Sequence, residues 1–188
     1  MTRIVAGAAR GRRLAVPPAG TRPTADRVRE ALFSAIDARI DLRGARVLDL
    51  FAGSGALGLE ALSRGAASVT LVESQPRAAA VIGKNIAAVG LPGATVLRTT
   101  AAAALAGWAG EPLDVVLVDP PYDIAGDQVT ALLAALASGD LLAGGALVAL
   151  ERPVKAADTV WPEGLEPGRV RRYGDTRIEI ATCYRAQS

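Results

Sequence analysis

Hydrophobic and polar positions change period several times along the chain, and these changes predict alternating strands and helices. Short apolar runs such as Arg46–Leu50 and Leu113–Val118 are typical of strands buried on both faces. Between such runs, segments such as Pro76–Val89 place apolar residues three and four positions apart, which is helical spacing. Because strands and helices alternate, we predict βαβ units and a mostly parallel sheet, an α/β fold.

The expected elements follow a leading helix with Thr24 as its N-cap, which ends near Ile40. Beyond residue 44 we expect strands at 46–50, 68–73, 95–98, 113–118 and 146–151 and helices at 56–64, 76–89, 101–108 and 127–137. Gly174-Asp175 separates two further strand-like runs, 170–173 and 177–184. A type II′ hairpin there adds an antiparallel pair to the parallel sheet.

Composition narrows the possible chemistry. The chain has 188 residues, of which 51% are hydrophobic and 21% charged, as in globular domains. Histidine is absent and Cys183 is the single cysteine, which excludes Ser-His-Asp and Cys-His catalytic sites and Cys/His zinc clusters. We expect no metal, a reducing cytoplasmic location, and Cys183 as a small buried apolar residue. The apolar stretch 131–150 is interrupted by polar residues and glycines, so it predicts a helix, a turn and a strand rather than a membrane span.

Charge is unevenly distributed. Residues 1–46 hold ten arginines and four acidic residues, for a net charge of +6, whereas residues 47–188 have a net charge of −4. A basic leading arm on a mildly acidic body indicates a phosphate-rich partner such as a nucleic acid. The alternative interpretation is a solvated arginine-rich face in a chain that uses few lysines.

A glycine-rich turn lies between the expected strand 46–50 and the helix that follows. Gly53, Gly55 and Gly58 form G-x-G-x-x-G, which lets the backbone approach a ligand at a helix N-terminus. Glu73 ends the next strand, twenty residues after Gly53, where a carboxylate typically binds the hydroxyls of an adenosine ribose. Together these features predict a site for an adenosine-bearing cofactor.

Asp49 distinguishes between the possible cofactors. A carboxylate four residues before Gly53 would repel the pyrophosphate of NAD. The same carboxylate suits the amino group and the sulfonium of S-adenosylmethionine, which carries no phosphate. The turn therefore favours a methyl donor over NAD, and a connector that binds no ligand is the remaining alternative.

A second turn, Asp119-Pro120-Pro121-Tyr122, follows the fourth expected strand. Ligands of parallel α/β sheets bind at the carboxyl ends of strands, so this turn is expected beside the glycine turn. The Asp119 carboxylate and the Pro120 carbonyl offer two acceptors on a stiff backbone. They suit the two N–H donors of an exocyclic amine, and Tyr122 can stack on the base that carries it. The expected chemistry is methyl transfer to that amine, accelerated mainly by positioning.

These motifs resemble known families. Asp49–Gly58 is similar to the cofactor motif of class I S-adenosylmethionine-dependent methyltransferases, and Asp119–Tyr122 to the catalytic motif of their amino-methylating branch. Arg3–Leu14 and Arg22–Phe33 resemble the leading arm and helix of the bacterial 16S ribosomal RNA guanine-N2 methyltransferases. Thr99–Ala101 departs from that family, which tends to place Asp or Asn against the cofactor adenine.

The resemblance implies a Rossmann-like domain at 45–188, with a seven-stranded sheet that has one antiparallel strand. It also implies that residues 1–44 form a basic arm and a helix that pack on this domain. It implies that a monomer methylates the N2 amine of guanine 966 in 16S ribosomal RNA, on the small ribosomal subunit or its assembly intermediate. The implied cofactor residues are Asp49, Phe51, Ala52, Gly53, Ser54, Gly55, Gly58, Glu73, Thr100 and Ala101; the catalytic residues are Asp119, Pro120, Pro121 and Tyr122. The candidate RNA-binding residues are Arg3, Arg10, Arg12, Arg13, Arg22, Thr24, Asp26 and Arg27.

Three other functions remain possible from the sequence. A DNA amino-methyltransferase, acting on adenine N6 or cytosine N4, would use the same turn, but 188 residues leave little room for a separate target-recognition region. A nucleotide-binding oxidoreductase is disfavoured by Asp49 and by the Pro-Pro turn. An RNA-binding assembly factor could keep the fold without catalysis.

Overall fold

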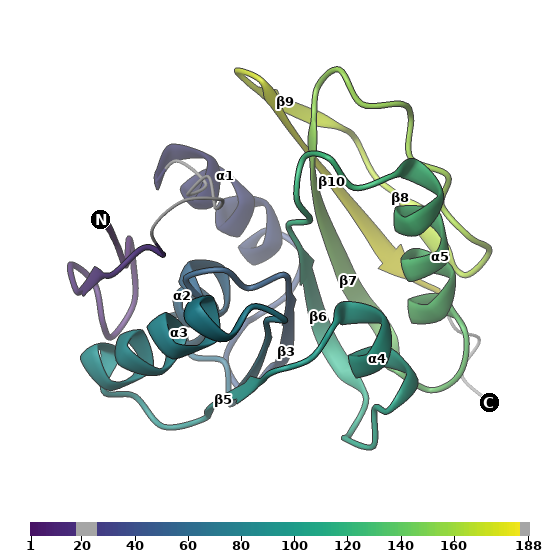
Figure 1. Ribbon diagram of the computed structural model, residues 1–188. Coiled ribbons are helices and arrows are strands. Elements are labelled where there is room, and N and C mark those ends of the chain that lie inside the picture. The colour runs from purple at the N-terminus through teal and green to yellow at the C-terminus, as the bar shows by residue number, and fades with distance from the viewer. Residues whose placement is uncertain (18–25, 185–188) are drawn as a thin grey trace.

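A central sheet separates two layers of helices in the computed structural model, which describes residues 1–17 and 26–184 (Figure 1). Helices α1, α2 and α3 cover one face of the sheet, and α4 and α5 cover the other. The helices are α1 (Asp26–Asp37), α2 (Ala56–Ser63), α3 (Pro76–Val89), α4 (Ala101–Ala106) and α5 (Gly126–Ala137). The strands of the sheet are β3 (Arg46–Leu50), β4 (Ser68–Val72), β5 (Ala94–Leu97), β6 (Leu113–Val118), β7 (Leu142–Pro153), β8 (Leu165–Pro167), β9 (Arg171–Tyr173) and β10 (Thr176–Cys183).

Strand order confirms the expected mostly parallel sheet. The order is β5-β4-β3-β6-β7-β10-β8, and along these seven strands only β10 runs against the others. The expected strand 170–173 is β9, which pairs with β10 off this path, and the strand that the expectation of seven did not include is β8. The chain leaves β3 toward β4 and β5 on one side and returns to β6 on the other. The carboxyl ends of β3 and β6 therefore flank the point where the order reverses, the usual ligand position in such sheets.

The predicted elements differ from the structure mainly at their ends. β7 begins at Leu142 rather than at residue 146, because the two glycines 144 and 145 form an irregularity within the strand instead of the expected turn. α1 ends at Asp37, and α4 ends before Gly107. β8 was not predicted. The stretch 131–150 forms the end of α5, a turn and part of β7, as expected, and no helix of the described residues is long and apolar enough to cross a membrane.

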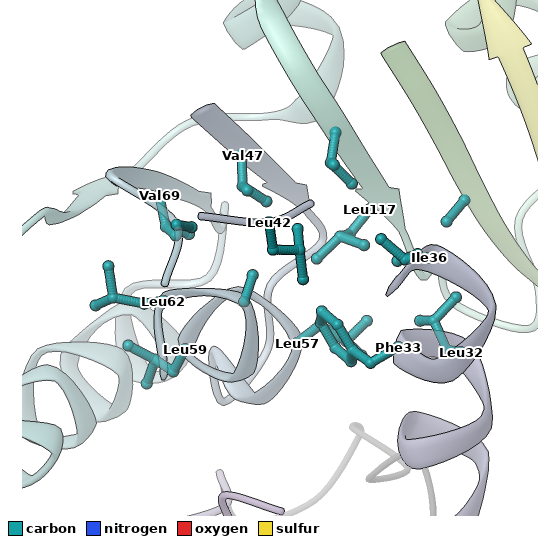
Figure 2. Close-up of a cluster of buried hydrophobic side chains, with 14 of the residues drawn as sticks. Leu32, Phe33, Ile36, Leu42, Val47, Leu57, Leu59, Leu62, Val69 and Leu117 are labelled. Carbon is teal, nitrogen blue, oxygen red and sulfur yellow. The ribbon is translucent and has the colours of Figure 1, made fainter. Parts of the chain in front are cut away.

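Two apolar clusters hold the helices on the sheet. The cluster beneath α1 and α2 is shown in Figure 2, where Phe33 and Ile36 of α1 lie close to Leu57 of α2 and Leu117 of β6. The other cluster joins α4 and α5 to the opposite face of the same strands and contains the buried Cys183, as predicted. Alternate residues of each strand enter opposite clusters, which explains why the central strands are continuously apolar.

The N-terminal residues form a small hairpin, β1 (Thr2–Arg3) with β2 (Arg13–Leu14), that docks on α2. Ile4 and Leu14 are buried in the cluster of α1 and α2. The fully buried carboxylate of Glu60 accepts hydrogen bonds from the backbone N–H groups of Val5 (2.8 Å) and Ala6 (3.0 Å). Glu60 also forms ion pairs with Arg29 and Arg64, at 3.5 and 3.0 Å. A buried carboxylate thus joins the hairpin, α1 and α2.

Two glycines of this hairpin form a matched pair for substitution by alanine. Gly7 and Gly11 share a φ of +84°, so alanine is equally strained at both. A Cβ on Gly7 would lie 1.9 Å from the Ser63 carbonyl oxygen, whereas a Cβ on Gly11 meets no atom within 4 Å. We expect Gly7→Ala to lower the free energy of unfolding by roughly 1–3 kcal/mol more than Gly11→Ala does, measured by urea denaturation. Equal losses would show that the hairpin does not dock on Ser63.

Candidate active site

A cavity of about 550 Å³ opens at the carboxyl ends of β3, β4, β6 and β7. Both predicted turns contribute to its wall, which confirms that they lie together. The predicted residues that line it are Asp49, Phe51, Ala52, Gly53, Ser54, Glu73, Asp119, Pro120, Pro121 and Tyr122. One pocket therefore brings the proposed cofactor turn and the proposed catalytic turn within reach of the same ligand.

The glycine turn reverses the chain by left-handed backbone conformations. Gly53 and Gly55 have φ values of +58° and +78°, and Phe51 has a φ of +63°. A residue other than glycine is uncommon in the left-handed backbone region, and it keeps that conformation only where the surrounding structure holds it. The Glu73 carboxylate supplies one such restraint, since it accepts a hydrogen bond from the Gly53 N–H at 2.9 Å and another from the Gln75 N–H at 2.8 Å. Glu73 thus holds the turn and still has free lone-pair positions for ligand hydroxyls.

Gly55 and Gly58 lie beneath the turn and do not line the cavity. A Cβ on Gly58 would come within 2.8 Å of the Leu71 and Val69 side chains, so glycine there allows α2 to pack closely on β4. This is the packing role usual for the third glycine of the motif. The Gly58 N–H donates to Asp49 Oδ2 at 2.8 Å, which fixes one oxygen of that carboxylate.

Asp49 is the most unusual acid in the cavity wall. Its side chain is 1% exposed, and its Oδ1 atom has no hydrogen-bond partner among the described residues. Burial raises the pKa of Asp49 to about 8; the Gly58 N–H opposes this shift, and the charges of Asp119 and Glu73 add to it. A cation at this point would restore the charged carboxylate to a favourable setting. The residues therefore fit a ligand with a positively charged group.

The Asp-Pro-Pro-Tyr turn continues directly from the sheet. Leu50 and Val118 are paired in the register of β3 and β6, and the Asp119 N–H approaches the Leu50 carbonyl oxygen at 3.5 Å. At the other end the Pro121 carbonyl accepts a hydrogen bond from Ile124 N at 3.0 Å. The turn is thus anchored on both sides, and its acceptors are held in fixed positions beside the glycine turn.

Tyr122 projects from this turn toward β10. The residue is 45% exposed, and its hydroxyl lies 3.3 Å from Thr176 Oγ1. A hydroxyl held at its far end leaves the face of an exposed aromatic ring available for stacking. The predicted stacking role of Tyr122 is compatible with this position.

Thr100 and Ala101 line a second cavity, of about 930 Å³, between α4 and α5. Phe51, Pro121 and Asp123 border both cavities, so the two meet at the glycine turn. Thr100 is the N-cap of α4, and its Oγ1 accepts from Ala103 N at 3.2 Å. The Thr100 hydroxyl caps the helix and keeps its O–H donor, and its predicted adenine contact stays a proposal.

The candidate RNA-binding residues that the structure describes do not line the cavity; they are Arg3, Arg10, Arg12, Arg13, Asp26 and Arg27. Arg10, Arg12, Arg13 and Arg27 are exposed. Asp26 is held within the fold: it accepts from Thr2 Oγ1 at 2.8 Å and from Arg29 at 3.0 Å, and it pairs with Arg3 at 3.7 Å. The predictions for Arg22 and Thr24 fall outside the described residues.

Several cavity residues were not predicted. Val28 and Arg29 of α1 line it, as do Tyr173, Asp175 and Thr176 of the C-terminal hairpin. Glu151 also lines the cavity from β7, where it follows Leu150, the register partner of Val118. Glu151 could have been predicted as a site residue, because it is a polar residue at the end of an apolar strand, which is the signal that identified Asp119. The hairpin residues carry no such signal, because their approach depends on the antiparallel β10.

Comparison with known proteins identifies the family. A family model described as Conserved hypothetical protein 95 matches residues 2–182. The chain belongs to this family. The match to the Conserved hypothetical protein 95 family includes the N-terminal hairpin, both turns and the C-terminal hairpin.

Relatives carry names that refer to RNA methylation. The chain is 48% identical over 121 residues to "Ribosomal RNA small subunit methyltransferase D" of Escherichia coli K12, a match that covers 64% of this chain and 60% of the relative's length. It is 35% identical over 184 residues to "Putative rRNA methyltransferase YlbH" of Bacillus subtilis, covering 95% and 97% of the two chains. A solved structure described as "Putative methyltransferase yhhF from Escherichia coli" superposes with a TM-score of 0.84 at 36% identity, over 97% and 98% of the chains. These similarities confirm the Rossmann-like methyltransferase fold.

Proposed function

We propose that the protein transfers a methyl group from S-adenosylmethionine to the exocyclic N2 amine of a guanine in 16S ribosomal RNA, with guanine 966 as the target and the small ribosomal subunit or its assembly intermediate as substrate. One observation carries the proposal: the Asp119–Tyr122 turn and the Asp49–Gly58 turn line the same cavity. The names of the relatives support methylation of small-subunit RNA. The N2 position and the target nucleotide rest on the resemblance of the N-terminal segments.

The cavity fits S-adenosylmethionine by the chemistry of its wall. Asp49 Oδ1 is a buried acceptor without a partner, suited to a cationic group, and Glu73 offers oxygens to ribose hydroxyls. Phe51, Thr100 and Ala101 border the adjoining cavity and are proposed to hold the adenine. When bound, the cofactor supplies a methyl carbon made electrophilic by the neighbouring sulfonium.

The chain's own residues act on the guanine amine. The Asp119 carboxylate and the Pro120 carbonyl are proposed to accept its two N–H hydrogens, which favours a pyramidal nitrogen and directs its lone pair toward the methyl carbon. On accepting the methyl group the nitrogen would lose a proton, and the Asp119 carboxylate, which accepts one of its N–H hydrogens in this arrangement, would take that proton. Tyr122 stacks on the base, and positioning of the two reactants supplies most of the acceleration.

Cofactor affinity is expected to depend on pH through Asp49. Because its pKa is raised to about 8, the carboxylate is mostly protonated below that pH and must lose a proton to face a cation. Affinity for S-adenosylmethionine should therefore fall as the pH is lowered from 8.5 to 6.5, by up to about tenfold per pH unit. Calorimetric titration measures this, and Asp49→Asn should bind more weakly with a flat pH profile.

A neutral ligand provides the control for this pH dependence. 5′-Methylthioadenosine keeps the adenosine and lacks both cations, so its affinity should not change over the same pH range. An equal pH dependence for both ligands would show that Asp49 does not face the cationic part of the cofactor.

The activity is tested with labelled S-adenosylmethionine and three acceptors: small subunits from a strain that lacks the modification, naked 16S RNA, and duplex DNA. We expect label in the first acceptor, at a guanine that mass mapping identifies as N2-methylated. Transfer to duplex DNA alone would favour a DNA amino-methyltransferase. Tight NAD binding without binding of the methyl donor would favour an oxidoreductase.

A further inference from the structure

An exposed basic strand, β9, lies beside the cavity on the side away from the N-terminal hairpin. Arg169, Arg171 and Arg172 are all exposed, and none of them forms an ion pair with any residue of 1–17 or 26–184. Other arginines are neutralised within the fold, namely Arg3, Arg29, Arg43, Arg46, Arg64 and Arg177. The charges of β9 thus face solvent without compensation.

The register of the hairpin places β9 at the rim of the cavity. Tyr173 pairs with Thr176, and both line the cavity; Arg171 pairs with Ile178, which is buried in the cluster beneath α1 and α2. Paired residues share a face of the sheet, so Arg171 and Tyr173 both lie on the face that bears the cavity. Residues two positions apart in a strand are about 7 Å apart. Arg171 therefore lies just outside the cavity wall.

The cavity itself is unsuited to phosphate. Six acidic residues line it: Asp49, Glu73, Asp119, Asp123, Glu151 and Asp175. They would repel a phosphate group, but they offer acceptors to a neutral base that brings N–H donors. When an enzyme takes one base out of an RNA strand, the phosphates of that strand stay outside the pocket. The charge pattern, acidic inside and basic at the rim, matches this division.

The N-terminal hairpin is also basic. Arg10, Arg12 and Arg13 are exposed on it, and α1, which lines the cavity through Val28 and Arg29, stands between that hairpin and β9 in Figure 1. The hairpin packs on Ser63, at the end of α2 opposite the glycine turn.

We propose that β9 is a second RNA-binding element: Arg171, on the face that bears the cavity, and Arg172, on the other face of the same strand, bind phosphates of the strand that presents the target base, aided by Arg169 just before β9. This inference rests on the proposed function and adds a second RNA-binding surface to it. The sequence alone did not indicate this surface, because residues 47–188 have a net charge of −4. The partner is single-stranded or loop RNA, because only a strand with one base turned out can place that base inside the acidic cavity and its phosphates on the basic strand outside.

The test is the double variant Arg171→Ala/Arg172→Ala, with Arg43→Ala as the matched control. Arg43 is exposed and precedes β3, at the end of the strands opposite the cavity, and its pairing with Asp41 is also exposed. We expect the double variant to bind unmodified small subunits roughly 20- to 60-fold more weakly at 0.1 M salt, and the slope of log affinity against log salt to fall by about 1.4–1.8. Arg43→Ala should leave both quantities unchanged.

Further measurements separate this inference from the proposed function. The double variant should keep the wild-type melting temperature, S-adenosylmethionine affinity and kcat at saturating subunits, and Arg171→Lys/Arg172→Lys should keep the salt slope. The inference would be overturned if the double variant bound RNA with the affinity and salt slope of the wild type. It would also be overturned if the double variant lost binding to vesicles that contain phosphatidylserine but kept its binding to RNA. If the wild-type protein methylates no ribosomal RNA, the proposed function fails; binding to a single-stranded RNA oligonucleotide then decides the inference alone.

Discussion

Asp119→Ala is expected to lower the rate of methyl transfer about 10³-fold. The loss has two physical sources: one of two acceptors that orient the amine disappears, and so does the nearest acceptor for its proton. Losses of this size are typical when a single preorganised polar group is removed from an active site. Single-turnover transfer of labelled methyl to unmodified small subunits measures the effect.

The same variant should bind S-adenosylmethionine and ribosomal RNA with affinities within about threefold of the wild type, since Asp119 lies beyond the glycine turn and inside the cavity rather than at its basic rim. Asp158→Ala, which removes an exposed acid from the loop after β7, serves as the control and should keep full activity. Activity of Asp119→Ala within tenfold of the wild type would show that the catalytic turn lies elsewhere.

Glu60→Ala is expected to destabilise the fold by about 3–5 kcal/mol. The substitution leaves the almost fully buried Arg29 without the carboxylate at 3.5 Å and removes the acceptor of the Val5 and Ala6 N–H groups. Losing one carboxylate of a buried charge network is costly, because Arg29 then keeps only the partly exposed Asp26, at 3.0 Å, as an acidic partner. For a chain of this size the melting temperature should fall by roughly 10 °C, measured by circular dichroism and by urea denaturation.

Two further variants sharpen the Glu60 experiment. Glu30→Ala, an exposed position on α1, should change stability by less than about 0.5 kcal/mol. Arg29→Met/Glu60→Leu replaces the buried pair with apolar groups and should recover part of the loss. A loss below 1 kcal/mol in Glu60→Ala would mean that the N-terminal hairpin is not part of the cooperative fold.

The sequence by itself determined most of the helices and strands. The bounds of β3, α3 and β6 are those that periodicity and turn residues predict. Pro76 begins α3, and Gly90 ends it in a left-handed conformation with φ of +69°. These signals depend on a few neighbouring residues, so they need no knowledge of the fold. The same holds for the glycine turn and for the type II′ hairpin, where Gly174 has a φ of +58°.

The meeting of the two turns was also predictable, although about 70 residues separate them. Strand order in an alternating α/β chain is restricted by a few connection rules, and ligands bind where the order reverses. Asp49 and Asp119 could therefore be assigned to one site from the sequence. Their environment could not, because the burial that raises the pKa of Asp49 arises only when α2 and the strands on both sides of β3 pack around it.

Only the tertiary structure decided which charged residues are structural and which face the ligand. Glu60 and Arg29 are ordinary helical charges in the sequence, yet they form the buried contact that holds the N-terminal hairpin. Arg171 and Arg172 are hidden in an acidic half of the chain, yet β10 brings their strand to the cavity rim. Local propensity is a property of short segments, whereas burial and proximity of charges arise only when the faces of distant segments pack together.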